Sequence, residues 1–284
     1  MTDEAGHTHT ARLSSVTIDT SYSASQYWRD FISFRELIFF LVWRDIVTRY
    51  KQSFLGISWS VFRPVLTVGM MTIIFGYLAK FPAGDVPYPA LVLAGLMPWQ
   101  FFTSSLQSST TSVTGATALV QRVYFPRLIL PFASIMVNLV DFLITSVIMA
   151  GILIWYKFIP DWRLFTIPFF MLLAVGASLG IGLWLSVFNV RFRDIKDIVP
   201  IITQIGTYVS PVGYSVSVVP EKYQLLYSLN PMVGIIDGFR WAILGGEHHI
   251  FMPALIVSVV FTLATFSSGV WFFTRAERTF PDVI

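Results

Sequence analysis

The chain has 284 residues, of which 55% are hydrophobic and only 12% are charged. Soluble domains carry about twice that share of charged residues, so this chain has too few charges to cover a water-soluble surface. The net charge of +3 is small for a nucleic-acid-binding protein, and the lack of cysteine excludes disulfides and thiol chemistry. The composition predicts an all-α membrane protein that crosses the bilayer several times.

The N-terminal part of the chain contains no segment that can span a membrane. Residues 1–27 are rich in Ser and Thr, and we expect a disordered cytoplasmic tail without a signal peptide. Residues 28–56 contain a helix that mixes Phe and Trp with Arg and Lys, which is typical of an amphipathic helix in the headgroup plane. Its cations could bind anionic lipid in general or the phosphate of one lipid headgroup.

Long stretches with almost no charged residues follow, and each is long enough for one membrane-spanning helix. They form a transmembrane domain from 57 to 274, followed by a cytoplasmic tail at 275–284. With six crossings, most of the 19 Lys and Arg lie on the side of the N-terminus, so both termini are expected in the cytoplasm. The six predicted spans are 57–79, 90–113, 128–156, 164–188, 198–218 and 251–273.

The segment between the fifth and sixth spans is apolar but too short to cross. Residues 223–236 have no charge, and Asn230-Pro231 interrupts them. A stretch of this length is more often re-entrant or interfacial than spanning. We therefore expect two short helices within 220–246 that dip into the outer leaflet and meet at Pro231.

Two of the predicted spans carry polar residues at helical spacing, so that each forms a stripe on one face. A carboxylate in a span costs about 2.5–3.5 kcal/mol on insertion scales and must face protein or water. The stripes could be hydrogen-bonding faces between helices or the lining of a hydrated conduit. They consist of Gln100, Thr103, Ser104, Gln107, Thr111 and Thr114 in the second span, and of Ser134, Asn138, Asp141 and Thr145 in the third.

The fourth predicted span contains a pair of glycines at the spacing that lets helices approach closely. Gly176 and Gly180 lie four residues apart in a GxxxG arrangement. Such small residues allow the backbones of two membrane helices to touch. We expect this face to serve helix packing.

The sequence lacks the residues that an energy-coupling or metal site would need. A phosphate-binding P-loop requires a Gly-Lys pair, and none of the five lysines follows a glycine. The histidines lie in the tail (His7, His9) and in a predicted outer loop (His248, His249), without a set of carboxylates, so we expect no metal site. Asp194-Ile-Lys-Asp197 resembles part of a lipid-phosphate transferase site, but the further carboxylates are missing.

Two short basic segments lie on the cytoplasmic side between predicted spans. Residues 115–127 and 189–197 could be plain connecting loops. They could also be small helices that dock on a soluble partner through Tyr124, Phe125 and Phe192.

Four segments of the chain have a distinctive sequence. They are WRDIVTRYKQSFLGISWSVFRP (43–64), RVYFPRLILP (122–131), NVRFRDIKDIVP (189–200) and SLNPMVGIIDGFRWAILGG (228–246). Together they resemble the membrane subunit of ABC-2 type exporters, and within that group they are most similar to permeases for lipid-linked O-antigen, teichoic acid and other polysaccharides or polyol phosphates. The resemblance covers about 30–274.

The resemblance implies roles for residues in each part of the chain. The amphipathic helix and the start of the first span would receive the substrate headgroup, the cytoplasmic segments would couple to an ATPase, and the two short helices would form an outer gate. The headgroup residues would be Arg44, Arg49, Lys51 and Arg63, and the channel lining Trp99, Gln100, Phe101, Thr103, Ser104, Gln107, Asn138, Asp141, Gln204 and Tyr208. The coupling residues would be Arg122, Tyr124, Phe125, Arg127, Arg191, Phe192, Arg193 and Asp194, and the outer gate Tyr223, Tyr227, Asn230, Pro231 and Phe239.

The resemblance further implies a homodimer of permeases in the bacterial inner membrane, on two cytoplasmic ABC ATPase subunits that bind ATP and Mg. The chain itself would need no cofactor and would catalyse no reaction. It would move an undecaprenyl-pyrophosphate-linked, O-antigen-like polysaccharide to the outer face, in contact with membrane lipids and without nucleic acid. The alternatives are an ABC-2 permease for teichoic acid, capsule, a drug or a lipid, and a membrane-bound lipid-phosphate transferase.

Overall fold

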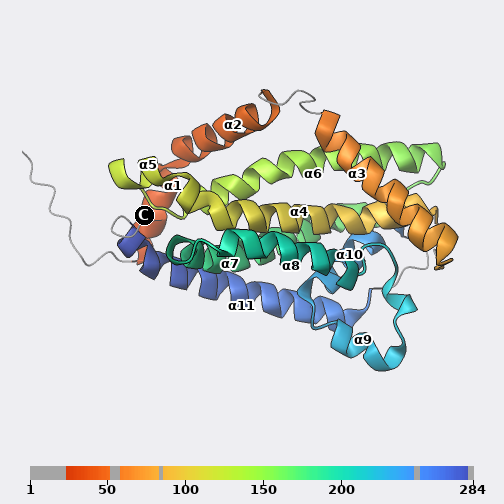
Figure 1. The fold of residues 1–284 in the computed structure, drawn as a ribbon. Helices are drawn as coiled ribbons and strands as arrows, with labels where there is room; N and C mark the ends of the chain where they lie inside the picture. The colour runs from red at the N-terminus through yellow and green to blue at the C-terminus, as the bar shows by residue number, and fades with distance from the viewer. Residues whose placement is uncertain (1–23, 52–57, 83–85, 246–249, 281–284) are drawn as a thin grey trace, which may run out of the picture.

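A computed structural model describes residues 24–51, 58–82, 86–245 and 250–280, and within these ranges the chain forms a bundle of helices without a strand (Figure 1). Most of the predicted N-terminal tail, all four histidines and residues 281–284 lie outside the described residues. The centre of the bundle is formed by α4 packed between α6 and α7, with α11 against the other side of α7. These helices are α4 (Tyr88–Gly115), α6 (Ile129–Trp155), α7 (Ile167–Arg191) and α11 (Met252–Ala276).

Of the three N-terminal helices, α2 and α3 cover one side of this centre, and α1 lies at one end of the bundle (Figure 1). In Figure 1, α2 runs along the first half of α6, and α3 crosses towards the opposite end of the bundle. A wider π-helical turn, η1 (Thr72–Leu78), continues α3. The position of α2 in the headgroup plane stays a prediction. The three helices are α1 (Ala24–Ser33), α2 (Arg35–Lys51) and α3 (Ser58–Met71).

Four helical stretches are long and apolar enough to cross a membrane, and they correspond to the first, third, fourth and sixth predicted spans. The second predicted span lies in α4, whose 28 residues are long enough but whose Ser, Thr and Gln lower the hydropathy. The fifth, 198–218, falls partly on α8 (Ile195–Val209), which has 15 residues, and partly on the turns that follow it. The count of six crossings therefore stays a prediction. The four stretches are Ser58–Leu78, Ile129–Trp155, Trp162–Arg191 and Met252–Thr279.

Short helices lie at the two ends of the bundle. Helix α5 (Thr117–Arg122) lies at the end that also holds α1 and the last described residues, whereas α9 (Glu221–Tyr227) lies at the other end (Figure 1). Helix α10 (Pro231–Leu244) starts at Asn230, whose side-chain oxygen accepts a hydrogen bond from the backbone of Met232 at 3.0 Å. The two short helices that the sequence predicts around Pro231 are thus present, and their insertion into the outer leaflet stays a prediction. Two short 3-10 turns, η2 (Trp162–Thr166) and η3 (Val216–Val218), precede α7 and α9.

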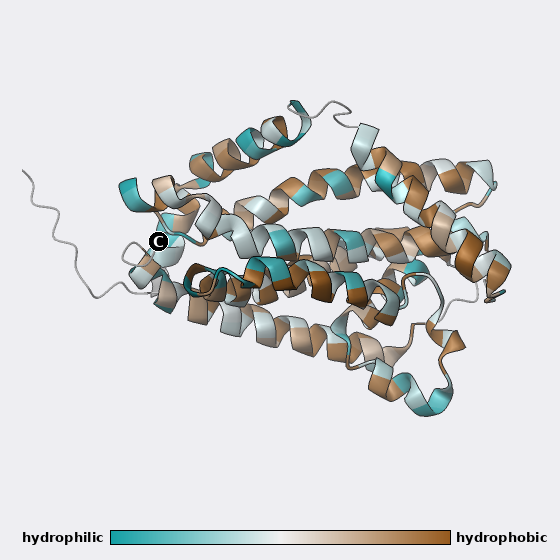
Figure 2. Ribbon diagram, in the orientation of Figure 1, coloured by the Kyte–Doolittle hydropathy of each residue, from teal (hydrophilic) through white to brown (hydrophobic). Residues whose placement is uncertain are grey.

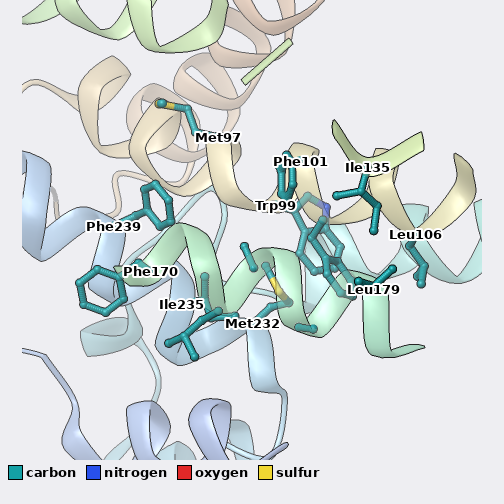
Figure 3. Packing of buried hydrophobic residues seen from close by; sticks show 14 of the residues in the cluster. Met97, Trp99, Phe101, Leu106, Ile135, Phe170, Leu179, Met232, Ile235 and Phe239 are labelled. Carbon is teal, nitrogen blue, oxygen red and sulfur yellow. The ribbon is translucent and has the colours of Figure 1, made fainter. Parts of the chain in front are cut away.

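The core is made by apolar side chains of α4, α6, α7 and α10 (Figure 3). Phe170 and Phe239 lie with ring centroids 6.3 Å apart, and both are buried. On the outside, large apolar side chains such as Leu143 and Leu263 are more than 60% exposed. In Figure 2 hydrophilic positions occur on α2, along α4 and on α8 and α9, and hydrophobic positions occur on all of the long helices. A helix bundle with this much exposed apolar surface is suited to lipid contact.

The glycine-rich face of α7 packs directly on α11. A Cβ at Gly180 would lie 2.6 Å from the backbone of Phe266, and one at Gly176 would lie 2.7 Å from Cγ2 of Thr262. Both distances are shorter than an ordinary van der Waals contact. The predicted role of Gly176 and Gly180 in close helix packing is confirmed.

Candidate functional site

A polar network joins α2, α3 and α6 about halfway along α6. Arg49 Nη1 donates to Asp141 Oδ2 at 2.7 Å and to Asn138 Oδ1 at 3.0 Å. The hydroxyls of Tyr50 and Ser60 donate to Asp141 Oδ1 at 2.7 and 2.8 Å. The side chains of Arg49 and Asp141 are 38% and 35% exposed, so the pair is partly shielded from solvent. Asp141 therefore has a cation and two hydroxyls as partners, as a carboxylate in a helix suited to cross a membrane requires.

Asn138 connects this network to α4. Its side chain is 1% exposed. Its amide nitrogen donates to Ser108 Oγ at 2.8 Å and to Ser105 Oγ at 3.3 Å, while its oxygen accepts from Arg49. A buried amide with partners on both of its polar atoms is fixed in orientation. Asn138 therefore holds the end of the Arg49 side chain in one place.

A cavity of about 540 Å³ opens beside this network, between α2, α3, α4, α6 and α8. The polar stripe of α4 forms one of its walls. The opposite side carries the Arg49–Asp141 pair and the first turns of α3, and rings of Trp59, Phe101 and Phe142 complete the lining. The α4 residues of the lining are Met97, Gln100, Phe101, Ser104, Gln107, Ser108 and Thr111.

The lining of this cavity carries more positive than negative charge. Arg49, Arg63 and Lys196 line it, and Asp141 is the one carboxylate among the described lining residues. Three cations and one anion give a net charge of +2. The Arg63 guanidinium lies 5.9 Å from the ring centroid of Trp59, and within the described part of the chain neither Arg63 nor Lys196 forms an ion pair. The cavity therefore favours an anionic group, because unpaired cations in a partly enclosed site attract one.

A second cavity of about 280 Å³ adjoins the first, under α2. Arg49, Ser108 and Thr111 line both cavities. The second cavity extends along α4 and α6 to Gly115 and Leu130. The two cavities thus follow α4 and α6 and meet at Arg49, Ser108 and Thr111. Together they are called the polar groove, and each cavity is one of its two chambers.

The sequence matches a model of one transporter family over most of its length. That model, described as "ABC-2 type transporter", aligns with residues 36–244, well over half of the chain. The chain belongs to the ABC-2 type transporter family. It is therefore a transport permease and a multi-pass membrane protein rather than an enzyme.

Several permeases named for polysaccharide transport are similar to this one over most of both chains. O-antigen export system permease protein RfbA of Klebsiella pneumoniae is 25% identical over 257 residues, 88% of this chain and 95% of its own. The RfbA protein of Myxococcus xanthus is 27% identical over 75% of this chain and 82% of its own. Polysialic acid transport protein KpsM of Escherichia coli is 25% identical over 72% and 79%.

The permease brings together six of the ten residues that were predicted to line a channel. Gln100, Phe101, Ser104, Gln107, Asn138 and Asp141 all line the larger cavity. Trp99 is buried and donates to Thr207 at 2.8 Å, and Thr103 bonds back to its own helix. Gln204 and Tyr208 are exposed on α8. These last four residues do not line either cavity.

The predicted headgroup residues have different surroundings. Arg49 and Arg63 line the larger cavity, whereas Arg44 lines the smaller one. Arg44 is paired with its neighbour Asp45 at 2.8 Å on the surface of α2, and Lys51 is exposed at the end of that helix. Of the predicted headgroup residues on α2, Arg49 is the one that bonds to α6.

The predicted coupling residues gather at the end of the permease that holds α5 (Figure 1). Tyr124 and Phe192 are 67% and 56% exposed, whereas Phe125 is 4% exposed and belongs to the core. A buried ring cannot enter a groove of a partner in this conformation, so Tyr124 and Phe192 are the exposed ones among the three rings predicted for docking. Of the charged residues predicted for coupling, those exposed are Arg122, Arg191, Arg193 and Asp194.

Arg127 forms hydrogen bonds with Glu277 inside this end of the bundle. Its backbone N–H donates to Glu277 Oε2 at 3.1 Å, and its guanidinium donates to the Glu277 carbonyl. Tyr27 of α1 donates to the same carboxylate at 3.1 Å. Burial, and then the nearby Glu277 carboxylate, raise the pKa of Tyr27 well above its usual range, so its phenol stays protonated and keeps donating. Arg127 thus ties the loop before α6 to the end of α11.

The predicted outer gate is partly exposed and partly core. Tyr223 is 52% exposed, and the hydroxyl of Tyr227 is 2.9 Å from that of Tyr214. Asn230 caps α10, and Pro231 is its first residue. Phe239 is fully buried, and the centroid of its ring lies 5.9 Å from that of Phe142. It therefore stabilises the bundle rather than facing a passage.

Several residues of the site were not predicted from the sequence, among them Tyr50, Ser60, Ser108 and Lys196. An intramembrane carboxylate does predict a partner. However, the partners of Asp141 lie 81 to 92 residues away along the chain. Nothing in the sequence selects these side chains among the other cations and hydroxyls. Within the described ranges no group of three His, Cys, Asp or Glu gathers as metal ligands.

Proposed function

We propose that this permease exports an undecaprenyl-pyrophosphate-linked, O-antigen-like polysaccharide from the cytoplasmic to the outer face of the inner membrane. The observation that carries the proposal is the larger cavity, which combines a net positive charge with aromatic rings and a row of hydroxyl and amide groups. Cations suit a pyrophosphate, and rings with hydroxyls suit sugars. The names of the similar permeases, which refer to O-antigen export and polysialic acid transport, support the same cargo class.

The proposed transporter is a homodimer of permeases with two ABC ATPase subunits in the cytoplasm. This sequence has no Gly-Lys pair, so ATP and Mg would be bound by the ATPase subunits. The exposed rings of Tyr124 and Phe192 are suited to contact them. Movement of the ATPases would reach the cavity through α7 and α8, since the segment with Phe192 joins these helices.

The proposed topology has six crossings with both termini in the cytoplasm. The bias of Lys and Arg supports it, since most of these residues precede the first span or lie in the segments with Arg122 and Arg193. In this orientation, α9 and the start of α10 form the outer end. The positions of α5 and α9 at opposite ends of the bundle support this topology (Figure 1).

Reconstitution into liposomes tests this function. The permease is assembled with its ATPase partner in vesicles that contain undecaprenyl-pyrophosphate-linked glycan on the ATPase side only. Appearance of the glycan on the opposite side is followed with a glycosidase that cannot cross the membrane. We expect transfer that depends on ATP and stops when the P-loop lysine of the ATPase is replaced.

Alternative cargoes are compared in the same vesicles. Lipid-linked teichoic acid, a capsular polysaccharide and a glycan-free lipid each replace the O-antigen-like glycan in separate preparations. Transfer of the glycan-free lipid but not of the glycan-linked one would contradict the proposal and support a lipid or drug exporter. Chemical conversion of the lipid without any ATPase would instead support a transferase.

A further inference from the structure

We propose that Arg49 and Asp141 form an exchangeable ion pair, in which a phosphate of the cargo lipid replaces the Asp141 carboxylate on Arg49 and thereby joins the two chambers of the groove. The inference rests on the proposed function, since it requires a cargo lipid that carries phosphate. It adds a role for Asp141: the carboxylate occupies the phosphate position while no cargo is bound.

The position of Arg49 makes it a barrier between the chambers. It is one of three residues that line both cavities, and the other two, Ser108 and Thr111, have short side chains. Its guanidinium is held by Asp141 and Asn138 on α6. A headgroup that moves along the groove under α2 therefore meets Arg49 before it reaches the larger cavity.

The charges of the larger cavity favour the exchange. While Asp141 neutralises Arg49, the cations of Arg63 and Lys196 remain without an ion pair in the described residues. A pyrophosphate brings about two negative charges, and the planar fork of Arg49 binds phosphate oxygens with two parallel hydrogen bonds. The bound phosphate then faces three cations, whereas Arg49 loses one carboxylate.

The carboxylate keeps a partner after the exchange. Arg49 binds Oδ2 of Asp141, whereas Tyr50 and Ser60 both donate to Oδ1. Tyr50 lies beside Arg49 on α2 and moves with it, but Ser60 lies on α3 and stays. The Ser60 hydrogen bond thus remains on Asp141, which lowers the cost of separating the ion pair. The two oxygens therefore have separate tasks: Oδ1 anchors the carboxylate, and Oδ2 holds Arg49.

The exchange also loosens α2 from α6. Arg49 lies in the last turn of α2, and its ion pair is the one that links these two helices within the described parts of the chain. When phosphate takes Arg49 away from Asp141, this end of α2 separates from α6. Cargo recognition and opening of the groove are then the same event.

Lipid binding to the full-length permease in nanodiscs tests the exchange. The probes are undecaprenyl pyrophosphate and the uncharged undecaprenol. We expect Arg49→Ala to weaken binding of the pyrophosphate about tenfold, since a charge-assisted contact is lost. Asp141→Asn should strengthen it severalfold, since the competing anion is removed. The matched control is Asp161→Asn, which makes the same charge change at an exposed residue outside both cavities.

The double variant Arg49→Ala with Asp141→Asn should bind as weakly as Arg49→Ala alone, because Asp141 competes only through Arg49. Wild-type protein that binds the pyrophosphate over undecaprenol, with Asp141→Asn binding no tighter, would overturn the exchange and leave the proposed cargo standing. Equal binding of the two lipids by wild-type protein would overturn the cargo itself.

A second measurement keeps Arg49 and Asp141 unchanged. Because the sequence has no cysteine, Thr48→Cys on α2 and Leu143→Cys on α6 allow two spin labels at exposed positions. Labelled protein is diluted with unlabelled protein so that distances within one chain are measured. The distance should lengthen with undecaprenyl pyrophosphate and stay constant with undecaprenol. A distance that the pyrophosphate leaves unchanged would overturn the separation of α2 from α6.

Discussion

Gly95 of α4 lies directly against Arg240 of α10: a Cβ at position 95 would be 2.7 Å from Arg240 Nη2. The Arg240 side chain is 1% exposed, and its guanidinium donates to the backbone carbonyls of Leu91, Val212 and Tyr214 at 3.2, 2.8 and 2.7 Å. The missing side chain of Gly95 leaves the space that the guanidinium occupies. This contact joins the start of α4 to α10 and to the segment between α8 and α9.

Replacing Gly95 by Ala should destabilise the permease. The new methyl group would also lie 2.9 Å from the carbonyl oxygen of Val212, and backbone there cannot move away cheaply. We expect a loss of about 1–3 kcal/mol, as for other overpacked cores. Thermal unfolding of the purified chain in detergent measures it. Gly151→Ala is the control, since nothing lies within 4 Å of its Cβ, and a similar loss in both variants would contradict the argument.

Arg240→Lys should be destabilising although it keeps the charge. A lysine ammonium is a compact point charge and cannot reach three carbonyls arranged around a planar guanidinium. At least one buried carbonyl would lose its partner, at a cost of about 1–3 kcal/mol. The control is Arg275→Lys, at an exposed position on α11. The explanation fails if the two variants unfold at the same temperature.

Gly180→Ala should weaken the contact between α7 and α11. Its Cβ would lie 2.6 Å from backbone atoms of Thr265 and Phe266, so the two helices would have to move apart. We expect a lower unfolding temperature than for Gly176→Ala, whose Cβ meets one side-chain methyl, that of Thr262, and not the backbone of α11. Melting curves of the two variants, recorded side by side, check this order.

Tyr124→Ala and Phe125→Ala should affect different properties, although the residues are neighbours: the first should affect binding of the ATPase subunit and the second the stability of the fold. Tyr124 is exposed, so its removal should reduce co-purification of the ATPase subunit and leave the unfolding temperature of the permease unchanged. Phe125 is buried, so its removal should destabilise the fold by about 3–5 kcal/mol. Full ATPase recovery with Tyr124→Ala would remove this ring from the docking surface.

Tyr27→Phe should loosen α1 from the end of α11. The substitution deletes the hydroxyl that donates to Glu277 at 3.1 Å, and we expect a loss of about 1 kcal/mol. Faster hydrogen exchange of the α1 backbone in the variant measures it. Tyr223→Phe serves as the control, because that side chain is exposed on α9. Equal protection of α1 in wild type and Tyr27→Phe would show that the hydroxyl contributes nothing.

The sequence alone predicted the features that follow from periodicity and composition. The long apolar stretches predicted the helices α6, α7 and α11, and Asn230-Pro231 predicted the break between two short helices. The GxxxG spacing predicted close packing of α7, because small residues four positions apart let the backbones of two helices approach closely. The stripe on α4 predicted a polar face but could not say whether it meets another helix or a cavity.

Only the tertiary structure decided which distant side chains meet. Arg49 and Asp141 lie 92 residues apart, and each is plausible in sequence for a separate role, one as a headgroup ligand and the other as a hydrogen-bonding group. Likewise, Tyr124 and Phe125 are adjacent aromatic residues, and only the packing of the folded chain buries one ring and exposes the other. Periodicity fixes the face of a helix that is polar or apolar, because it depends on backbone geometry within the helix. The partner of that face depends on how the helices pack, which local sequence does not encode.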